Sequence, residues 1–125
     1  LSVLANLRYR LEGRLTKQGI RLNWQVSDVP KLHSLTPQQV LDILRILQEA
    51  FTNILKHAGA KTITIATGFS DTSVFIRVID DGQGFVTNRE GRGLTSMRRR
   101  AEALRAKLEI IPSITGTSLS LYLPR

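Results

Sequence analysis

Residues 36–58, with the sequence TPQQVLDILRILQEAFTNILKHA, decide the fold because they predict a long amphipathic helix. The helix begins with a capping box: Thr36 is the N-cap, Pro37 takes the first helical position and Gln39 reaches back to the cap. Gly59 is a suitable terminator after about Ala58. At a helical period the apolar residues fall on one side, which predicts the face that packs on the core: Val40, Ile43, Leu44, Leu47, Phe51, Ile54 and Ala58.

The segments around this helix predict the rest of the fold. A helix is expected over residues 1–18, ended by Gly19, and a strand over residues 21–26. Further strands are expected at residues 62–69, 73–79, 107–111 and 117–123, with a helix marked by Leu94, Met97, Ala101 and Leu104. This order predicts an α+β fold, a two-layer α/β sandwich in which three helices cover one face of a mixed, largely antiparallel sheet of about five strands.

Length and composition limit the classes of protein. The 125 residues are 42% hydrophobic, which is enough for one core, so residues 1–125 are interpreted as a single domain. Cysteine is absent, which excludes disulfides and thiolate zinc sites. No apolar run approaches the ~20 residues that span a bilayer, so we expect a cytoplasmic domain. The first helix has no N-cap, so the chain is expected to be a piece of a longer protein.

The net charge of +8 points to an anionic partner: nucleotide, nucleic acid or an acidic protein. Basic residues gather between Arg89 and Lys107, where a run of arginines is more often a solvated helix face than a specific site. Aromatic residues make up only 6% of the chain, and no stacking platform or zinc-finger spacing is present. A basic nucleic-acid-binding module is therefore the weaker alternative, and no nucleic acid is expected as a partner.

Three motifs contain residues that could bind a metal ion, a planar base or a phosphate. The first is the polar side of the 36–58 helix, where Glu49, Asn53, Lys56 and His57 are spaced i, i+4, i+7 and i+8. A carboxylate, an amide, an ammonium and an imidazole together suit metal and phosphate binding, although a solvated face has the same spacing.

The second motif, Val78-Ile79-Asp80-Asp81-Gly82-Gln83-Gly84-Phe85, ends an apolar strand. A carboxylate there can accept from the amino group of a planar base, and the glycines Gly82 and Gly84 let a ligand approach the backbone. An ordinary Asp-Gly turn is the alternative. The third motif, Gly91-Arg92-Gly93-Leu94, enters a helix whose free amides can bind an anion, or it is a flexible loop with a glycine cap.

In this order, the three motifs resemble the N, G1 and G2 boxes of the ATP-binding domain shared by gyrase-type ATPases, related chaperones, mismatch-repair ATPases and sensor histidine kinases. The segment 48–58 is most similar to the N box of two-component histidine kinases. The resemblance covers residues 7–124 and is greatest to a short-lid subgroup with Asp-Asp-Gly-x-Gly and Gly-x-Gly-Leu-x-x-Met-Arg-x-Arg. A serine kinase of the anti-sigma-factor type shares the boxes and is the other enzymatic alternative.

The resemblance implies a role for each motif residue in binding ATP and Mg²⁺. Asn53 would ligate Mg²⁺, and Glu49 would activate the accepting imidazole or orient a water on the metal. Lys56 and His57 would contact phosphate, Asp80 would accept from the adenine amino group, and Thr117 would lie near adenine through water. The glycines would shape the site: Gly82 and Gly84 at the base, and Gly91 and Gly93, followed by Leu94, at a lid assisted by Arg92.

The resemblance also implies what the chain lacks. In the family the accepting histidine lies on a separate dimerisation helix, whereas this chain has only His33 and His57. The expected partners are therefore the dimerisation helices of a parent kinase, with a response regulator downstream. The parent kinase is expected to be anchored in the inner membrane. The isolated domain is expected to be monomeric. The lid, residues 86–90, is unusually short.

Overall fold

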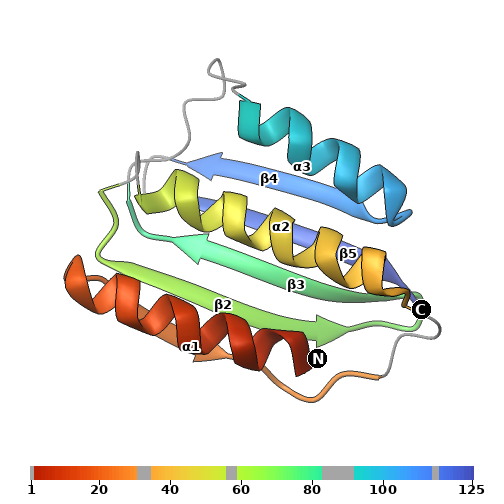
Figure 1. Cartoon of the computed structure of the whole chain (residues 1–125), viewed down its shortest axis with the longest axis horizontal. Helices are drawn as coiled ribbons and strands as arrows, with labels where there is room; N and C mark the ends of the chain where they lie inside the picture. The colour runs from red at the N-terminus through yellow and green to blue at the C-terminus, as the bar shows by residue number, and fades with distance from the viewer. Residues whose placement is uncertain (1, 31–34, 56–58, 83–91, 114–115) are drawn as a thin grey trace.

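The computed structural model describes residues 2–30, 35–55, 59–82, 92–113 and 116–125. Within them the chain forms eight elements (Figure 1): α1 (Ser2–Lys17), β1 (Arg21–Gln25), α2 (Pro37–Asn53), β2 (Thr62–Phe69), β3 (Ser73–Asp80), α3 (Arg92–Ala103), β4 (Lys107–Ser113) and β5 (Gly116–Pro124). Every element predicted from the sequence is present, with ends that differ by a few residues. None of the helices in this described part is long and apolar enough to cross a membrane.

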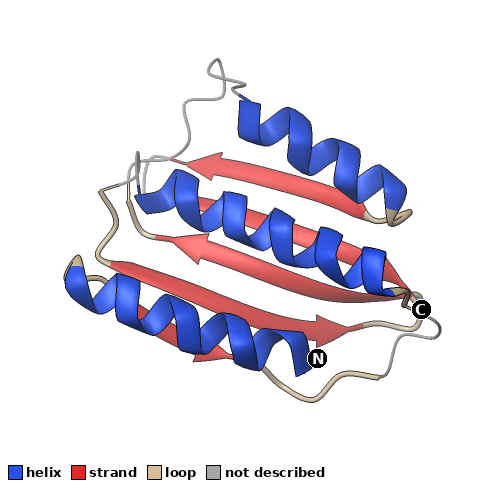
Figure 2. Cartoon of the chain, in the orientation of Figure 1, coloured by secondary structure: helices blue, strands red, loops and turns tan. Residues whose placement is uncertain are grey.

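The strands form one sheet in the order β1-β2-β3-β5-β4. β1 pairs with β2 in parallel, and the three other pairings are antiparallel. The helices α1, α2 and α3 lie side by side on the same face of this sheet (Figure 2). The predicted two-layer α+β sandwich with a mixed, largely antiparallel sheet is therefore confirmed.

Side chains on the covered face of the sheet alternate with those on the open face. Along β3, Val74, Ile76 and Val78 are buried against the helices, whereas Phe75 and Arg77 lie on the open face. On that open face the Arg77 guanidinium lies 4.5 Å from the centre of the Phe75 ring. The strand therefore delivers its last residue, Asp80, to the helix side of the sheet.

The start of α2 matches its prediction. Gln39 donates its backbone N–H to the Thr36 hydroxyl over 3.1 Å, and the Thr36 N–H donates to the Gln39 side chain over 2.9 Å. The α-helix ends at Asn53, and residues 54–55 continue as a π-helical turn. The predicted end near Ala58 lies outside the described residues.

The core-facing side of α2 was only partly predicted. Ile43, Leu47, Phe51 and Ile54 are buried as expected, but Val40 and Leu44 are only partly buried. In their place, Ile46, Ala50 and Asp42 are buried. The reason is that α3 packs closely on one flank of α2 and extends the buried stripe toward itself.

Both α1 and α3 end in a Schellman arrangement. At α1 the Ile20 N–H donates to the Leu15 carbonyl over 2.9 Å, and Gly19 has a φ of 70°. At α3 the left-handed position is taken by Arg105, with a φ of 56°, and the Ala106 N–H donates to the Ala101 carbonyl over 2.9 Å. These ends direct the chain back onto the sheet, where β1 and β4 begin.

Candidate functional site

The predicted site residues that the structure describes come from α2, β3, α3 and β5, which meet at one end of the molecule. Figure 1 shows that α2 and β3 end on the same side, where α3 begins, β4 ends and β5 begins. Glu49 and Asn53 lie one turn apart near the end of α2. Asp80 is the last residue of β3, and its register partner on β5 is Thr117. The fold thus brings parts of the first two motifs to the same end of the helix layer.

Asp80 is a buried carboxyl, with 4% of its surface exposed. Its Oδ1 accepts a hydrogen bond from the Gly82 backbone N–H over 2.9 Å. Burial raises the pKa of the Asp80 carboxyl above its usual range, and the neighbouring Asp81 charge raises this pKa further, while the Gly82 and Thr117 backbone amides partly oppose the shift. No cation pairs with it among the described residues. An acceptor held in a dry environment suits recognition of a donor on a ligand.

Asp81 has a different role although it is the next residue. Its Oδ1 accepts from the backbone N–H groups of Lys61 and Thr62, over 2.8 and 2.9 Å. The bond from Thr62 is the largest contribution to a lowered pKa of the Asp81 carboxyl. Asp81 therefore ties the end of β3 to the start of β2, and Asp80 alone of the pair is buried on the helix side.

Gly116 is a residue that the sequence reasoning did not assign to the site. Its φ is 143°, and a Cβ added there would lie 1.9 Å from the Asp80 carbonyl oxygen. Only glycine allows β5 to pass this close to the end of β3. The one signal in the sequence is a glycine directly before Thr117, a residue whose exposed fraction is only 4%. Gly116 therefore keeps Asp80 and Thr117 in their register.

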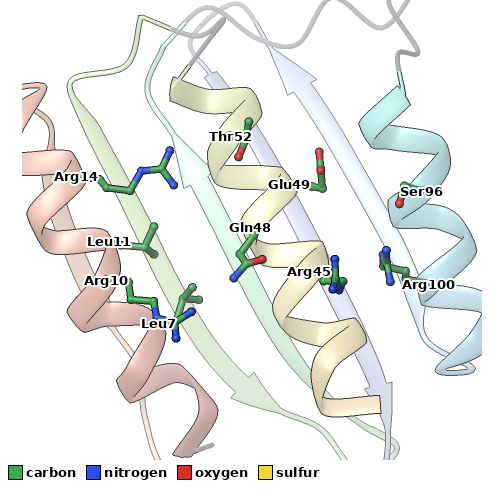
Figure 3. A pocket seen from close by; sticks show the side chains of 10 residues that line it. All are labelled: Leu7, Arg10, Leu11, Arg14, Arg45, Gln48, Glu49, Thr52, Ser96 and Arg100. Carbon is green, nitrogen blue, oxygen red and sulfur yellow. The ribbon is translucent and has the colours of Figure 1, made fainter. Parts of the chain in front are cut away.

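Asn53 and Glu49 supply hard oxygen atoms. Both side chains are partly exposed, and Glu49 lines a cavity of about 400 Å³ over the helix layer (Figure 3). In Figure 3, Ser96 and Arg100 extend from α3 toward α2 in the same region. An amide oxygen and a carboxylate one helical turn apart suit Mg²⁺, which prefers few protein oxygens and keeps its waters. This donor set fits the metal that the resemblance implies.

Arg100 also joins α3 to α2. Its Nη1 donates to the Asp42 Oδ1 over 3.2 Å, and the Gln38 amide donates to the same oxygen over 3.3 Å. Asp42 is 6% exposed, and the Arg100 Nε is buried without a hydrogen-bond partner. Arg100 is the last arginine of the Gly-x-Gly-Leu-x-x-Met-Arg-x-Arg pattern, but the sequence reasoning did not identify this ion pair.

Only some of the remaining predicted residues lie in the part of the chain that the structure describes. Lys56, His57, Gly84 and Gly91 lie outside the described residues, as do His33 and the short lid at residues 86–90. Arg92, Gly93 and Leu94 form the first turn of α3. That helix start is where the third motif was expected to present its amides.

Comparison with known proteins identifies relatives along the whole chain. Residues 38–125 match the family described as histidine kinase-, DNA gyrase B-, and HSP90-like ATPase. The signal transduction histidine-protein kinase/phosphatase UhpB of Salmonella typhimurium is 34% identical over 119 residues, which are 91% of this chain and 23% of that protein. The sensor histidine kinase YxjM of Bacillus subtilis is 32% identical over 127 residues, covering 99% of this chain and 30% of that protein. The chain therefore spans less than a third of the length of these relatives.

Solved structures show the same fold. The Acinetobacter baumannii histidine kinase AdeS has a TM-score of 0.82 at 15% identity, covering 98% of this chain and 63% of that one. The histidine kinase domain of the Erythrobacter litoralis EL346 blue-light activated histidine kinase has a TM-score of 0.71 at 23% identity, covering 85% and 52%. At these identities the likeness extends to the fold alone.

Proposed function

Because the chain belongs to the histidine kinase-, DNA gyrase B-, and HSP90-like ATPase family, we propose that it binds ATP with Mg²⁺ and donates the γ-phosphoryl group to a histidine on a separate dimerisation domain. The observation that carries this proposal is the buried Asp80 carboxyl at the end of β3, on the same side of the molecule as the end of α2 with Asn53. The named relatives, which are sensor histidine kinases, favour this function over a serine kinase of the anti-sigma-factor type.

The base is assigned to the end of the sheet. Asp80 accepts from the adenine amino group, and Gly82 and Gly84 let the base lie against the backbone. Thr117 on β5 completes this pocket and contacts adenine through a water molecule. A carboxylate that meets the amino group of adenine would meet only a carbonyl on guanine, so the same contact selects ATP.

The phosphates are assigned to the end of α2 and the start of α3. Asn53 is the proposed ligand of Mg²⁺, Lys56 and His57 contact phosphate, and Glu49 orients a water on the metal or the accepting imidazole. The backbone amides of Gly91, Arg92, Gly93 and Leu94 are the proposed donors to the phosphate oxygens. When bound, the metal neutralises charge on the phosphates.

The transfer itself needs little covalent work from the protein. The imidazole nitrogen of the acceptor forms a bond to the γ-phosphorus, and the bond from that phosphorus to the oxygen bridging the β-phosphate breaks, releasing ADP. Glu49 is the proposed acceptor of the proton that the imidazole loses. This chain contributes position and charge, and the acceptor nitrogen must approach to about 3–3.5 Å roughly in line.

The partners belong to the proposal as well. The dimerisation helices of the parent kinase would present the accepting histidine, and a response regulator would act downstream. We also propose that the domain is cytoplasmic and belongs to a parent kinase anchored in the inner membrane. The isolated domain is proposed to be monomeric. A basic nucleic-acid-binding module is not favoured, because the chain matches an ATPase family over residues 38–125.

The test is Asn53→Ala in a reconstituted kinase that contains the dimerisation helices. We expect the variant to fold, to lose the Mg²⁺-dependent part of ATP binding and to lose phosphotransfer, because one hard oxygen ligand is removed from a partly exposed site. Asn23→Ala is the matched control, since Asn23 is an exposed amide on β1. Phosphotransfer by Asn53→Ala at the rate of the unmodified protein would rule out the metal assignment.

A further inference from the structure

The cavity over the helix layer has a character that nucleotide binding does not explain. Its volume is about 400 Å³, and its lining comes from all three helices. α1 contributes Arg10 and Arg14, α2 contributes Arg45 and Glu49, and α3 contributes Arg100 (Figure 3). Arg10 and Arg14 extend from α1 toward α2, whereas Arg45 lies with Glu49 on the side of α2 toward α3. We call this cavity the arginine groove.

The charge of the arginine groove is largely uncompensated. Arg10, Arg14 and Arg45 are exposed, and none of them has an ion pair among the described residues. Elsewhere the chain does pair such groups, as Arg8 does with Glu12 over 2.8 Å. Within the groove Glu49 is the only acidic residue, and Arg100 is occupied by Asp42. The guanidinium groups of Arg10 and Arg14 therefore extend into the space between α1 and α2, where a carboxylate fits.

The shape of the groove favours a polypeptide over a small anion. Arg10 and Arg14 are one helical turn apart, about 6 Å along α1. From Arg45 to Thr52, which also lines the groove, α2 extends about 10 Å. The two walls thus offer donors over more than one turn, and a guanidinium binds a carboxylate with two parallel hydrogen bonds.

We propose that the arginine groove binds an acidic helical segment of a partner protein, with Asp or Glu side chains spaced one turn apart. Leu7 and Leu11 form the buried floor of the groove, each with 3% of its surface exposed, so the charged side chains supply the contacts to such a helix. Single-stranded nucleic acid fits less well, because no aromatic side chain for stacking lines the groove, and duplex DNA is distinguished by the test below. The groove shares Glu49 with the proposed ATP site, whereas Arg10 and Arg14 have no role there and so test the groove separately.

The experiment uses a labelled 20-residue helical peptide with Glu at i, i+4 positions, and the same peptide with Lys in place of Glu. Fluorescence anisotropy at several salt concentrations should show binding of the Glu peptide alone, weakening as salt rises. The double variant Arg10→Glu/Arg14→Glu should bind it at least tenfold more weakly. The control Lys17→Glu/Arg21→Glu makes the same charge change at exposed residues outside the groove and should stay within twofold.

Three outcomes would overturn the proposal once circular dichroism shows that both variants are folded. Equal weakening in the two double variants would mean that net charge alone attracts the peptide. If duplex DNA outcompetes the Glu peptide, and if DNA binding is lost in Arg10→Glu/Arg14→Glu, the groove would be assigned to nucleic acid. Full displacement of the peptide by millimolar pyrophosphate would assign it to a small anion. ATP titrations of the same proteins report on the proposed function separately.

Discussion

At the scale of single residues, two adjacent carboxyl groups have opposite environments. Burial on the helix side raises the pKa of Asp80, whereas the backbone amides of Thr62 and Lys61 lower the pKa of Asp81. The motif contains two adjacent carboxylates, and the resemblance pointed to Asp80 as the one that accepts from the base. The contacts of Asp81 support this choice, because its carboxylate accepts from backbone amides of Lys61 and Thr62 at the start of β2. Gly116 escaped prediction, because its close approach to Asp80 depends on a pairing of distant strands.

Asp80→Asn should stabilise the folded chain increasingly as the pH rises from acid to neutral. Below the usual pKa near 3.8 the Asp80 carboxyl is protonated in both folded and unfolded chains, so the variant and the unmodified protein should be similar. As the pH rises through the raised folded-state pKa, the unmodified protein must ionise a buried group and loses stability relative to the variant. Urea unfolding at a series of pH values measures this difference, and a difference that does not change with pH would contradict the raised pKa.

Gly116→Ala should destabilise the fold by about 2–4 kcal/mol, because the new Cβ meets the Asp80 carbonyl and a φ of 143° is unfavourable for alanine. The matched control is Gly13→Ala in α1, where a Cβ meets nothing within 4 Å and helix propensity favours alanine by up to about 1 kcal/mol. Denaturant unfolding compares the two variants. If Gly116→Ala were as stable as Gly13→Ala, the proposed role of this close approach would be wrong.

At the scale of elements, the contact between α2 and α3 links the two helices that are proposed to hold the phosphates. The sequence predicted the capping box of α2 correctly because a cap is a local pattern. It did not predict that Asp42 is buried, since a polar residue in the first half of an amphipathic helix normally faces solvent. The partner that allows its burial, Arg100, is 58 residues away and becomes its neighbour only when α3 packs on α2.

Asp42→Ala should cost about 2 kcal/mol of unfolding free energy. The loss of a partner from a buried ion pair costs more, but the Arg100 side chain is 30% exposed and water compensates part of the loss. A double-mutant cycle with Arg100→Ala should give a coupling energy of at least about 0.5 kcal/mol. Additive effects of the two substitutions would show that this ion pair does not join the helices.

At the scale of the whole molecule, the sheet gathers residues from distant parts of the chain. The periodicity of the sequence predicted eight elements, their order and the layering, because each of these follows from local patterns. The strand order β1-β2-β3-β5-β4 could not be read from those patterns, since it places β5 between β3 and β4. That order brings Thr117 beside Asp80 and so forms the proposed base pocket.

The central claim is that this end of the molecule binds ATP through Asp80 in a manner that Mg²⁺ strengthens. The most direct measurement is a calorimetric titration of the protein and of Asp80→Ala with ATP and with GTP, each with and without Mg²⁺. We expect saturable binding of ATP that is stronger with Mg²⁺ and weaker for GTP. In Asp80→Ala the affinity for ATP should fall by roughly 10- to 100-fold, in keeping with the loss of a charged hydrogen bond of about 1.5–3 kcal/mol. Equal affinity of the unmodified protein for ATP and GTP, or an Asp80→Ala variant that still binds ATP at full affinity, would contradict the account.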